Sequence, residues 1–247
     1  MKNNIKNCIC FMMVMILSLS TFINIYAEEV NWEKYKSFKY TEMTDTEVGI
    51  FYYNGKKTKI TIPAKIKGLK VSTVNILKAK GLKSIKLSRY VKIVYLAKNR
   101  TLKKVTVDKK NKYLSVKNNM VLNKKGTRLK TVLGGYDEIV VPKSVKKVDR
   151  YSFGDSKIKK VTFQKNVMVI HSPFTNCRKL EEIVFKGNSI PKISEASFGH
   201  TNNLNFHVNS KELADELLEE LRGKHYLYAR IYVDNELIYE EKINRVY

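Results

Sequence analysis

Histidine is the residue of this chain best suited to metal binding or acid–base catalysis, and it is rare. The four histidines are His171, His200, His207 and His225, and none belongs to an HExxH pair or has a cysteine at zinc-ligand spacing. His200 and His207 make a pair without a third ligand, which is more typical of ordinary surface residues. We therefore expect no metal site, no cofactor and no catalytic histidine.

Nucleophiles and carboxylates are equally poor candidates for catalysis. Cys177 follows His171 by six residues, but its pattern position is in a core, where a thiolate is poorly solvated. The acids Glu216, Glu219 and Glu220 fall on the expected solvent face of a terminal helix. The chain has no G-x-S-x-G, P-loop or dinucleotide fingerprint. We expect no enzymatic activity, and a secreted hydrolase is the weakest functional hypothesis.

Charge points to a different kind of chemistry. The 247 residues include 47 Lys and Arg against 23 Asp and Glu, a net charge of +24. Such a field attracts polyanions, including anionic cell-wall polymers, sulfated glycans, nucleic acid and anionic lipid. Only eight of the 47 are Arg, and Lys attracts without geometric specificity, so sequence-specific nucleic-acid recognition is not expected. The lysine content is also consistent with a compositional bias that has no function.

The first 27 residues resemble a targeting segment. Lys2 and Lys6 precede an apolar run from Cys8 to Ile23, and Ala27 precedes two glutamates. This order predicts a signal peptide at residues 1–27, with an uncleaved membrane anchor as the alternative. Cleavage would remove Cys8 and Cys10 and leave Cys177 alone, so no disulfide framework is expected. No transmembrane segment is expected in the cleaved protein. The protein would then be secreted, free or associated with the cell wall.

Most of the chain behind this segment is a repeat. Five segments share the spacing F/L/I-x-x-C/N/A/S/T-x-x-L-x-x-I/V-x-F/V/L, one of them with a deletion and the last one partial: 76–87, 96–107, 153–163, 174–185 and 198–204. Equivalent Ile or Val positions recur every 20 to 22 residues. Each copy holds two short alternating segments typical of strands, and one copy has too little apolar surface to fold alone. The repeat predicts a mainly β solenoid of stacked turns.

These residues resemble the BspA-like leucine-rich repeats of bacterial surface and secreted proteins. The stretch from Ile60 to Val71 is similar to an opening repeat of that family, and residues 107–142 are similar to a hairpin inserted between repeats. The resemblance covers roughly residues 38–208. It implies a leucine-rich-repeat solenoid and, for many members of the family, adhesion or interaction with host or cell surfaces.

Both ends of the solenoid are predicted to be capped. Phe38–Tyr40 and Val48–Tyr53 predict an N-terminal β-hairpin. Ser210 followed by leucines at helical spacing predicts a helix over 211–221, and a hairpin over 226–243 follows it. The expected organisation is a signal peptide at 1–27, an N-terminal cap at 28–59, a solenoid at 60–208 with an inserted hairpin at about 108–138, and a C-terminal cap at 209–247.

A binding face follows from the strand pattern. Residues between the apolar positions of each strand face solvent, and stacking aligns equivalent positions in columns. The candidate binding residues are Lys86, Lys104, Thr106, Lys160 and Thr162. Two functional hypotheses remain open: adhesion to a host extracellular or surface protein, and retention on an anionic cell-wall polymer. Strong salt dependence of binding would distinguish the second from the first.

Overall fold

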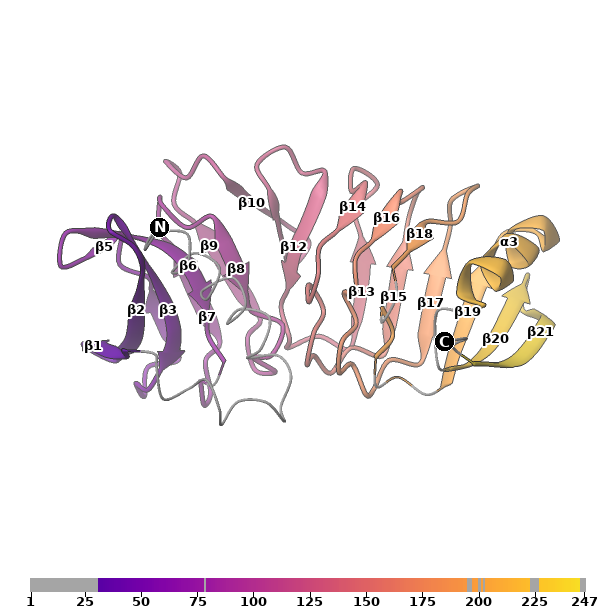
Figure 1. Ribbon diagram of the computed structural model, residues 1–247, viewed down its shortest axis with the longest axis horizontal. Coiled ribbons are helices and arrows are strands. Elements are labelled where there is room, and N and C mark those ends of the chain that lie inside the picture. The colour runs from indigo at the N-terminus through magenta and orange to yellow at the C-terminus, as the bar shows by residue number, and fades with distance from the viewer. Residues whose placement is uncertain are drawn as a thin grey trace, which may run out of the picture.

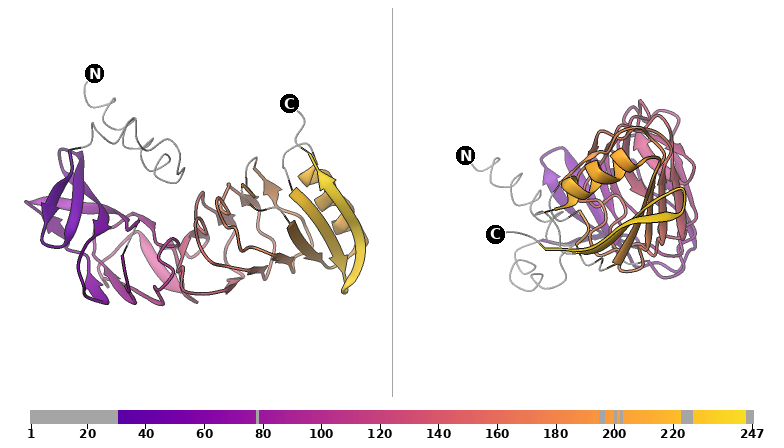
Figure 2. Two further views of the ribbon diagram at one scale, coloured as in Figure 1. Left: turned by 90° about the horizontal axis from the view of Figure 1, so that it is seen from below. Right: turned by 90° about the vertical axis from the view of Figure 1, so that its right-hand side faces the viewer.

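The computed structural model describes residues 31–77, 79–194, 197–199, 201, 203–222 and 227–244. The expected signal peptide at 1–27, His200 and His225 lie outside these residues. The described chain forms an elongated, curved stack of turns with its strands running across the long axis (Figures 1 and 2). Within the same ranges, none of the helices has the length and apolar character needed to span a membrane.

The N-terminal cap is a hairpin-based sheet joined to the first turns. Strands β1 (Glu33–Tyr35), β2 (Phe38–Thr44) and β3 (Glu47–Tyr53) pair antiparallel in order. Strand β6 (Leu69–Asn75) pairs parallel with β3 and with β8 (Ile93–Tyr95), and β5 (Lys65–Ile66) turns back on β6. The predicted N-terminal β-hairpin is therefore confirmed, with β1 as an additional outer strand.

A second, smaller sheet belongs to the same N-terminal half. It consists of β4 (Lys59–Thr61), β7 (Ser84–Leu87) and β9 (Lys104–Val107), all parallel. Ile60, Ile85 and Val105 lie side by side in its register and point toward the interior. These are the repeat positions that predicted a stacked strand.

The C-terminal half has two six-stranded sheets. The first is β13 (Glu138–Val141), β15 (Lys160–Phe163), β17 (Glu182–Phe185), β19 (Asn203–Val208) and β20 (Leu227–Val233) in parallel, with β21 (Glu236–Ile243) antiparallel at the end. The second is β10 (Leu114–Lys117), β11 (Met120–Asn123), β12 (Arg128–Val132), β14 (Lys147–Val148), β16 (Val169–Ile170) and β18 (Lys192–Ile193). Strands β10 and β11 form an antiparallel hairpin between the two halves.

Aromatic side chains stack through the core from turn to turn. The ring centroids of Phe153 and Phe174 are 4.8 Å apart, and those of Phe174 and Phe198 are 5.7 Å apart. Phe163 and Phe185 form a second stack at 5.3 Å. All five rings are at most 3% exposed. Fully burying such a side chain contributes roughly 1.5–3 kcal/mol, so the stacks hold neighbouring turns together.

The two halves meet at a close backbone contact. A Cβ atom added to Gly134 would lie 1.9 Å from the carbonyl oxygen of Ala97, and one added to Gly135 would lie 2.5 Å from that of Leu102. The ladder of the β4–β7–β9 sheet does not continue into β13. Glycine lets the backbone of this turn approach the preceding turn where that ladder is interrupted.

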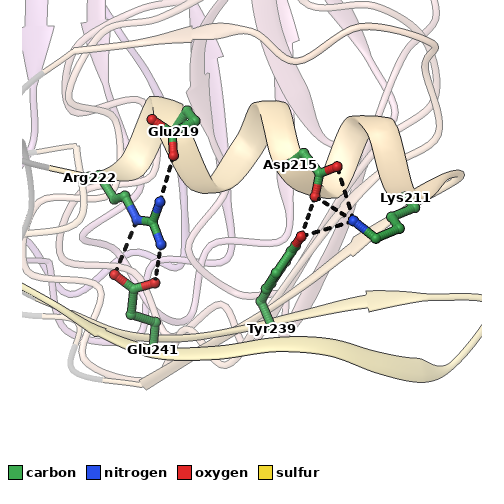
Figure 3. A network of polar contacts seen from close by, with 6 residues as sticks. All are labelled: Lys211, Asp215, Glu219, Arg222, Tyr239 and Glu241. Carbon is green, nitrogen blue, oxygen red and sulfur yellow. Dashed lines mark hydrogen bonds and ion pairs between the residues drawn. The ribbon is translucent and has the colours of Figure 1, made fainter.

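A helix and the final hairpin cover the C-terminal end. Ser210 is the N-cap of helix α3 (Lys211–Leu221), as the sequence predicted, and its hydroxyl accepts a hydrogen bond from the Leu213 amide. Figure 3 shows two polar clusters that join the helix to β21: Lys211 and Asp215 with Tyr239, and Glu219 and Arg222 with Glu241. The predicted helix-plus-hairpin cap is therefore confirmed.

Glu220 differs from its expected position on a purely solvent-exposed face. Its carboxylate accepts a 2.8 Å hydrogen bond from the Ile193 amide at the edge of the β18 sheet. The helix thus satisfies a backbone donor that would otherwise be open to pairing with another strand. The sequence pattern predicts only the face of the helix on which Glu220 lies. The hydrogen bond between Glu220 and Ile193 depends on where the helix packs.

Substituting Gly134 with Ala should destabilise the fold, because the added methyl group would overlap the carbonyl group of Ala97. We expect a loss of about 1–3 kcal/mol in the free energy of unfolding, measured by urea denaturation. Gly154→Ala is the control, since an added Cβ there would lie 3.3 Å from the carbonyl oxygen of Tyr151, a much milder contact than the one at Gly134. Equal effects of the two substitutions would contradict the close contact between the halves.

Candidate functional site

The outward side chains of the β4–β7–β9 sheet form a polar surface, which we call the basic face. It consists of six residues: Lys59, Thr61, Ser84, Lys86, Lys104 and Thr106. Three of the predicted binding residues, Lys86, Lys104 and Thr106, belong to it. Ser84 is half-buried and the other five are exposed.

Lysines and hydroxyl residues alternate on the basic face in both directions. In one row Lys59 lies beside Ser84, and Ser84 lies beside Lys104. In the next row Lys86 lies between Thr61 and Thr106. In this register no two lysines are direct cross-strand neighbours, although neighbouring strands are only about 4.8 Å apart. The arrangement offers ammonium groups for anions, each flanked by hydroxyl groups that can donate or accept hydrogen bonds.

No carboxylate of the described chain neutralises the basic face. Among the described residues, Lys59, Lys86 and Lys104 take part in no ion pair. Residues 48–107 contain 16 Lys and Arg and not one Asp or Glu, so this quarter of the chain carries 16 of the 24 net charges. Closely spaced cations without counter-charges repel one another, and a bound polyanion would relieve that repulsion. This acid-free run is the sequence signal that points to the basic face rather than to charge in general.

The other two predicted residues lie in a different sheet. Lys160 and Thr162 are on β15, and Lys160 forms a 2.6 Å ion pair with Glu182 on β17. Thr162 is only 8% exposed, and its cross-strand neighbours are Val140 and Val184. The structure therefore brings Lys86, Lys104 and Thr106 together, and it places Lys160 and Thr162 apart from them in a neutralised environment.

A row of less polar residues crosses this second sheet. We call it the mixed face: Val140, Thr162, Val184, His207 and Tyr232 occupy equivalent positions on five parallel strands. Val140 is 47% exposed, and the rings of His207 and Tyr232 stack with centroids 5.0 Å apart. Burial lowers the pKa of His207 below its usual value and Lys160 adds to this effect, while Glu182 opposes it. His207 is therefore neutral at pH 7.

The other reactive residues that the structure describes do not converge. His171 is exposed at the surface, and Cys177 is buried, with its thiol donating to the carbonyl oxygen of Phe153 at 3.1 Å. Burial raises the pKa of Cys177 to about 12, as expected for a small core side chain and opposite to what a nucleophile requires. Across the described ranges, no three His, Cys, Asp or Glu side chains gather closely enough to hold a metal ion.

Comparison with known proteins agrees with the repeat. Residues 135–219 match the family described as BspA type leucine rich repeat region, in six copies. A leucine-rich repeat protein of Eubacterium ventriosum is 14% identical over 72% of this chain and 78% of its own, with a TM-score of 0.35. A leucine rich cell surface protein of Faecalibacterium prausnitzii is 13% identical over 73% of this chain and 72% of its own, with a TM-score of 0.33. No curated protein matches the chain.

The Cys177 thiol should be unreactive in the folded protein. In a protein that begins at Glu28, Cys177 is the sole cysteine, so thiol titration reports on it alone. Because its pKa lies near 12, we expect negligible reaction with a thiol reagent at pH 8 and complete reaction after unfolding in guanidinium chloride. Rapid labelling of the native protein would contradict a core role and reopen the question of a reactive thiol.

Proposed function

Because residues 135–219 are a BspA-type leucine-rich-repeat region, we propose that this chain is an extracellular binding protein, retained on an anionic cell-wall polymer by its basic face. The proposal assigns recognition to the protein and no chemical step. It rests on one observation: three lysines of the basic face lie on adjacent parallel strands, alternate with hydroxyl residues and have no carboxylate partner among the described residues.

The chemistry of the basic face favours a polymer of phosphate and polyol units. Ammonium groups bind phosphate as compact point charges, and serine and threonine hydroxyls hydrogen-bond to sugar or polyol hydroxyls. Proteins that bind single-stranded nucleic acid add aromatic rings on which bases stack. The outward positions of the basic face are Lys, Thr and Ser, so this stacking contribution is missing from it.

Neutralising two lysines of the basic face should weaken binding to isolated cell wall. Lys86→Gln combined with Lys104→Gln removes about 1 kcal/mol of attraction per lysine, so we expect roughly a tenfold to fiftyfold loss of affinity. Binding should also fall steeply as salt is raised, because exposed charges are screened. The measurement is a sedimentation assay with purified wall across a salt series.

A matched variant separates the basic face from net charge. Lys34→Gln combined with Lys179→Gln makes the same change in charge at exposed positions outside the basic face. This control should keep nearly the full affinity of the unaltered protein. If both double variants lose the same affinity, or if wall binding resists high salt, the basic face is not the site of retention.

Adhesion to a host protein is a second candidate function, and the mixed face favours it. Protein interfaces combine an apolar centre with a polar rim. Val140 is an exposed apolar residue at one end of the mixed face, and the Lys160–Glu182 pair leaves its border neutral. A surface of this kind repels no partner by charge, in contrast to the basic face. The two candidate functions therefore use different sheets of the same solenoid.

Placing a charge on the mixed face should abolish adhesion while leaving wall retention intact. For Val140→Asp we expect loss of salt-resistant, saturable binding to immobilised host matrix proteins, because a buried unpaired carboxylate is costly in an interface. Ile93→Asp is the control, since Ile93 on β8 is 41% exposed and lies on another sheet. Unchanged binding by Val140→Asp, or equal losses in both variants, would exclude the mixed face.

A further inference from the structure

The turns that follow the strands of the basic face carry cations of their own. Arg89 and Lys109 lie in the turns after β7 and β9, Lys65 is the first residue of β5 directly after the turn that follows β4, and all three are exposed. Two hydrogen bonds link these turns: the Ser88 hydroxyl donates to the carbonyl oxygen of Pro63, and the Asp108 amide donates to that of Leu87. A line of positive charge thus runs along one edge of the basic face, in the direction of the solenoid axis.

The same edge is basic in the C-terminal half. Lys143, Lys165 and Lys186 follow β13, β15 and β17, and all are exposed. Pairing of β13 with β15 and of β15 with β17 stacks these three turns in register. The mixed face is neutral, but the turns beside it remain basic.

The β11–β12 turn fills the space between the two groups of turns. On one side, the Lys124 ammonium donates to the carbonyl oxygen of Asn111 at 2.9 Å. On the other side, the Ser144 hydroxyl donates to the carbonyl oxygen of Gly126 at 2.8 Å. Lys125 lies between these two contacts and is exposed. The turn after the inserted hairpin thereby continues the line of charge where the ladder of the basic face ends.

Carboxylates of the solenoid lie at other positions. Asp149 pairs with Arg128 and Lys130, and Asp137 pairs with Lys157. In the turns described above the one acid is Asp108, whose carboxylate already accepts a hydrogen bond from the Lys110 amide. Within the part of the chain that the structure describes, no ion pair involves Lys65, Arg89, Lys109, Lys125, Lys143, Lys165 or Lys186.

We propose that these stacked turns, from Lys65 to Lys186, form a turn ridge that binds a linear polyol-phosphate polymer lying parallel to the solenoid axis. The inference rests on the proposed function and extends it from one face to the length of the molecule. Within each group, turns that follow paired strands are about 4.8 Å apart, so the ridge presents rows of single charges to a chain of repeating phosphates. Figure 1 shows β13, β15 and β17, which precede three of these turns, side by side along the long axis.

Binding along a row has a consequence that binding at one face lacks. Each turn adds a weak, salt-sensitive contact, and contacts made by one polymer chain reinforce one another through effective concentration. Affinity should therefore rise steeply with polymer length until the polymer spans the ridge. A glycerol phosphodiester dimer can occupy only the basic face or one or two turns.

Lys165→Glu combined with Lys186→Glu tests the ridge far from the basic face. The probes are a glycerol phosphodiester dimer and long poly(glycerol phosphate), with affinity measured by calorimetry at low and moderate salt. We expect at least a tenfold loss of affinity for the polymer, a smaller salt dependence and a much smaller change in affinity for the dimer, which can still occupy the basic face or the remaining turns. Circular dichroism verifies that each variant is folded.

The matched control is Lys159→Glu combined with Lys179→Glu. These exposed lysines precede β15 and β17, whereas Lys165 and Lys186 follow the same strands, so the change in charge and the repeats are equal and the edge differs. The control should retain most of the polymer affinity. Equal losses in the two variants would overturn the ridge, and so would equal affinity of the unaltered protein for dimer and polymer.

The outcomes also separate the ridge from the proposed function. If the Lys86 and Lys104 variant loses polymer binding but the ridge variant does not, the basic face stands and the ridge falls. If the unaltered protein binds neither probe, both proposals are overturned. If single-stranded DNA of matched charge and length binds as tightly as poly(glycerol phosphate), the ridge selects charge alone and the commitment to a polyol-phosphate polymer is wrong.

Discussion

Parallel pairing of each turn with the next is the interaction on which this structure depends. Strands such as β14 and β15 have two and four residues, too few to be stable by themselves. Their stability comes from hydrogen bonds to neighbouring turns and from side chains that stack across them, such as Phe153 on Phe174. Because equivalent residues lie one strand spacing apart, any residue type that recurs in the repeat becomes a continuous line on the surface or in the core.

The spacing of apolar residues was sufficient to predict this architecture. Ile85 and Val105 in one half, and Val161 and Ile183 in the other, stack as their repeat positions indicated. The interruption between β9 and β13 was not predictable in the same way. It depends on contacts such as the approach of Gly134 to Ala97, which join residues 37 positions apart in the chain and leave no periodic trace. Glycine alone indicates a turn and does not identify the partner of that turn.

Prediction of the candidate site was limited by what a single strand reveals. Alternation correctly pairs the position of Lys86 with that of Thr106 and the position of Lys160 with that of Glu182. Whether such a lysine is free or neutralised depends on the residue type one turn away, and the environment of Thr162 depends on both neighbouring strands. The acid-free run of residues 48–107 was the stronger signal, because a lysine in it can be neutralised only by a carboxylate from another part of the chain. Lys67, Lys92 and Lys98 have such partners, whereas the lysines of the basic face have none among the described residues.

The two halves solve one electrostatic problem in different ways. Like charges directly opposite each other on neighbouring strands are destabilising, so a stacked repeat rich in lysine must separate or neutralise them. The C-terminal sheet neutralises them, since Glu138, Lys160 and Glu182 alternate in sign along one row. The N-terminal sheet separates them with Ser84 and Thr106, and its lysines keep their charge. The second solution leaves a positive potential on the N-terminal sheet, and this unneutralised charge is the basis for proposing a polyanion as the partner.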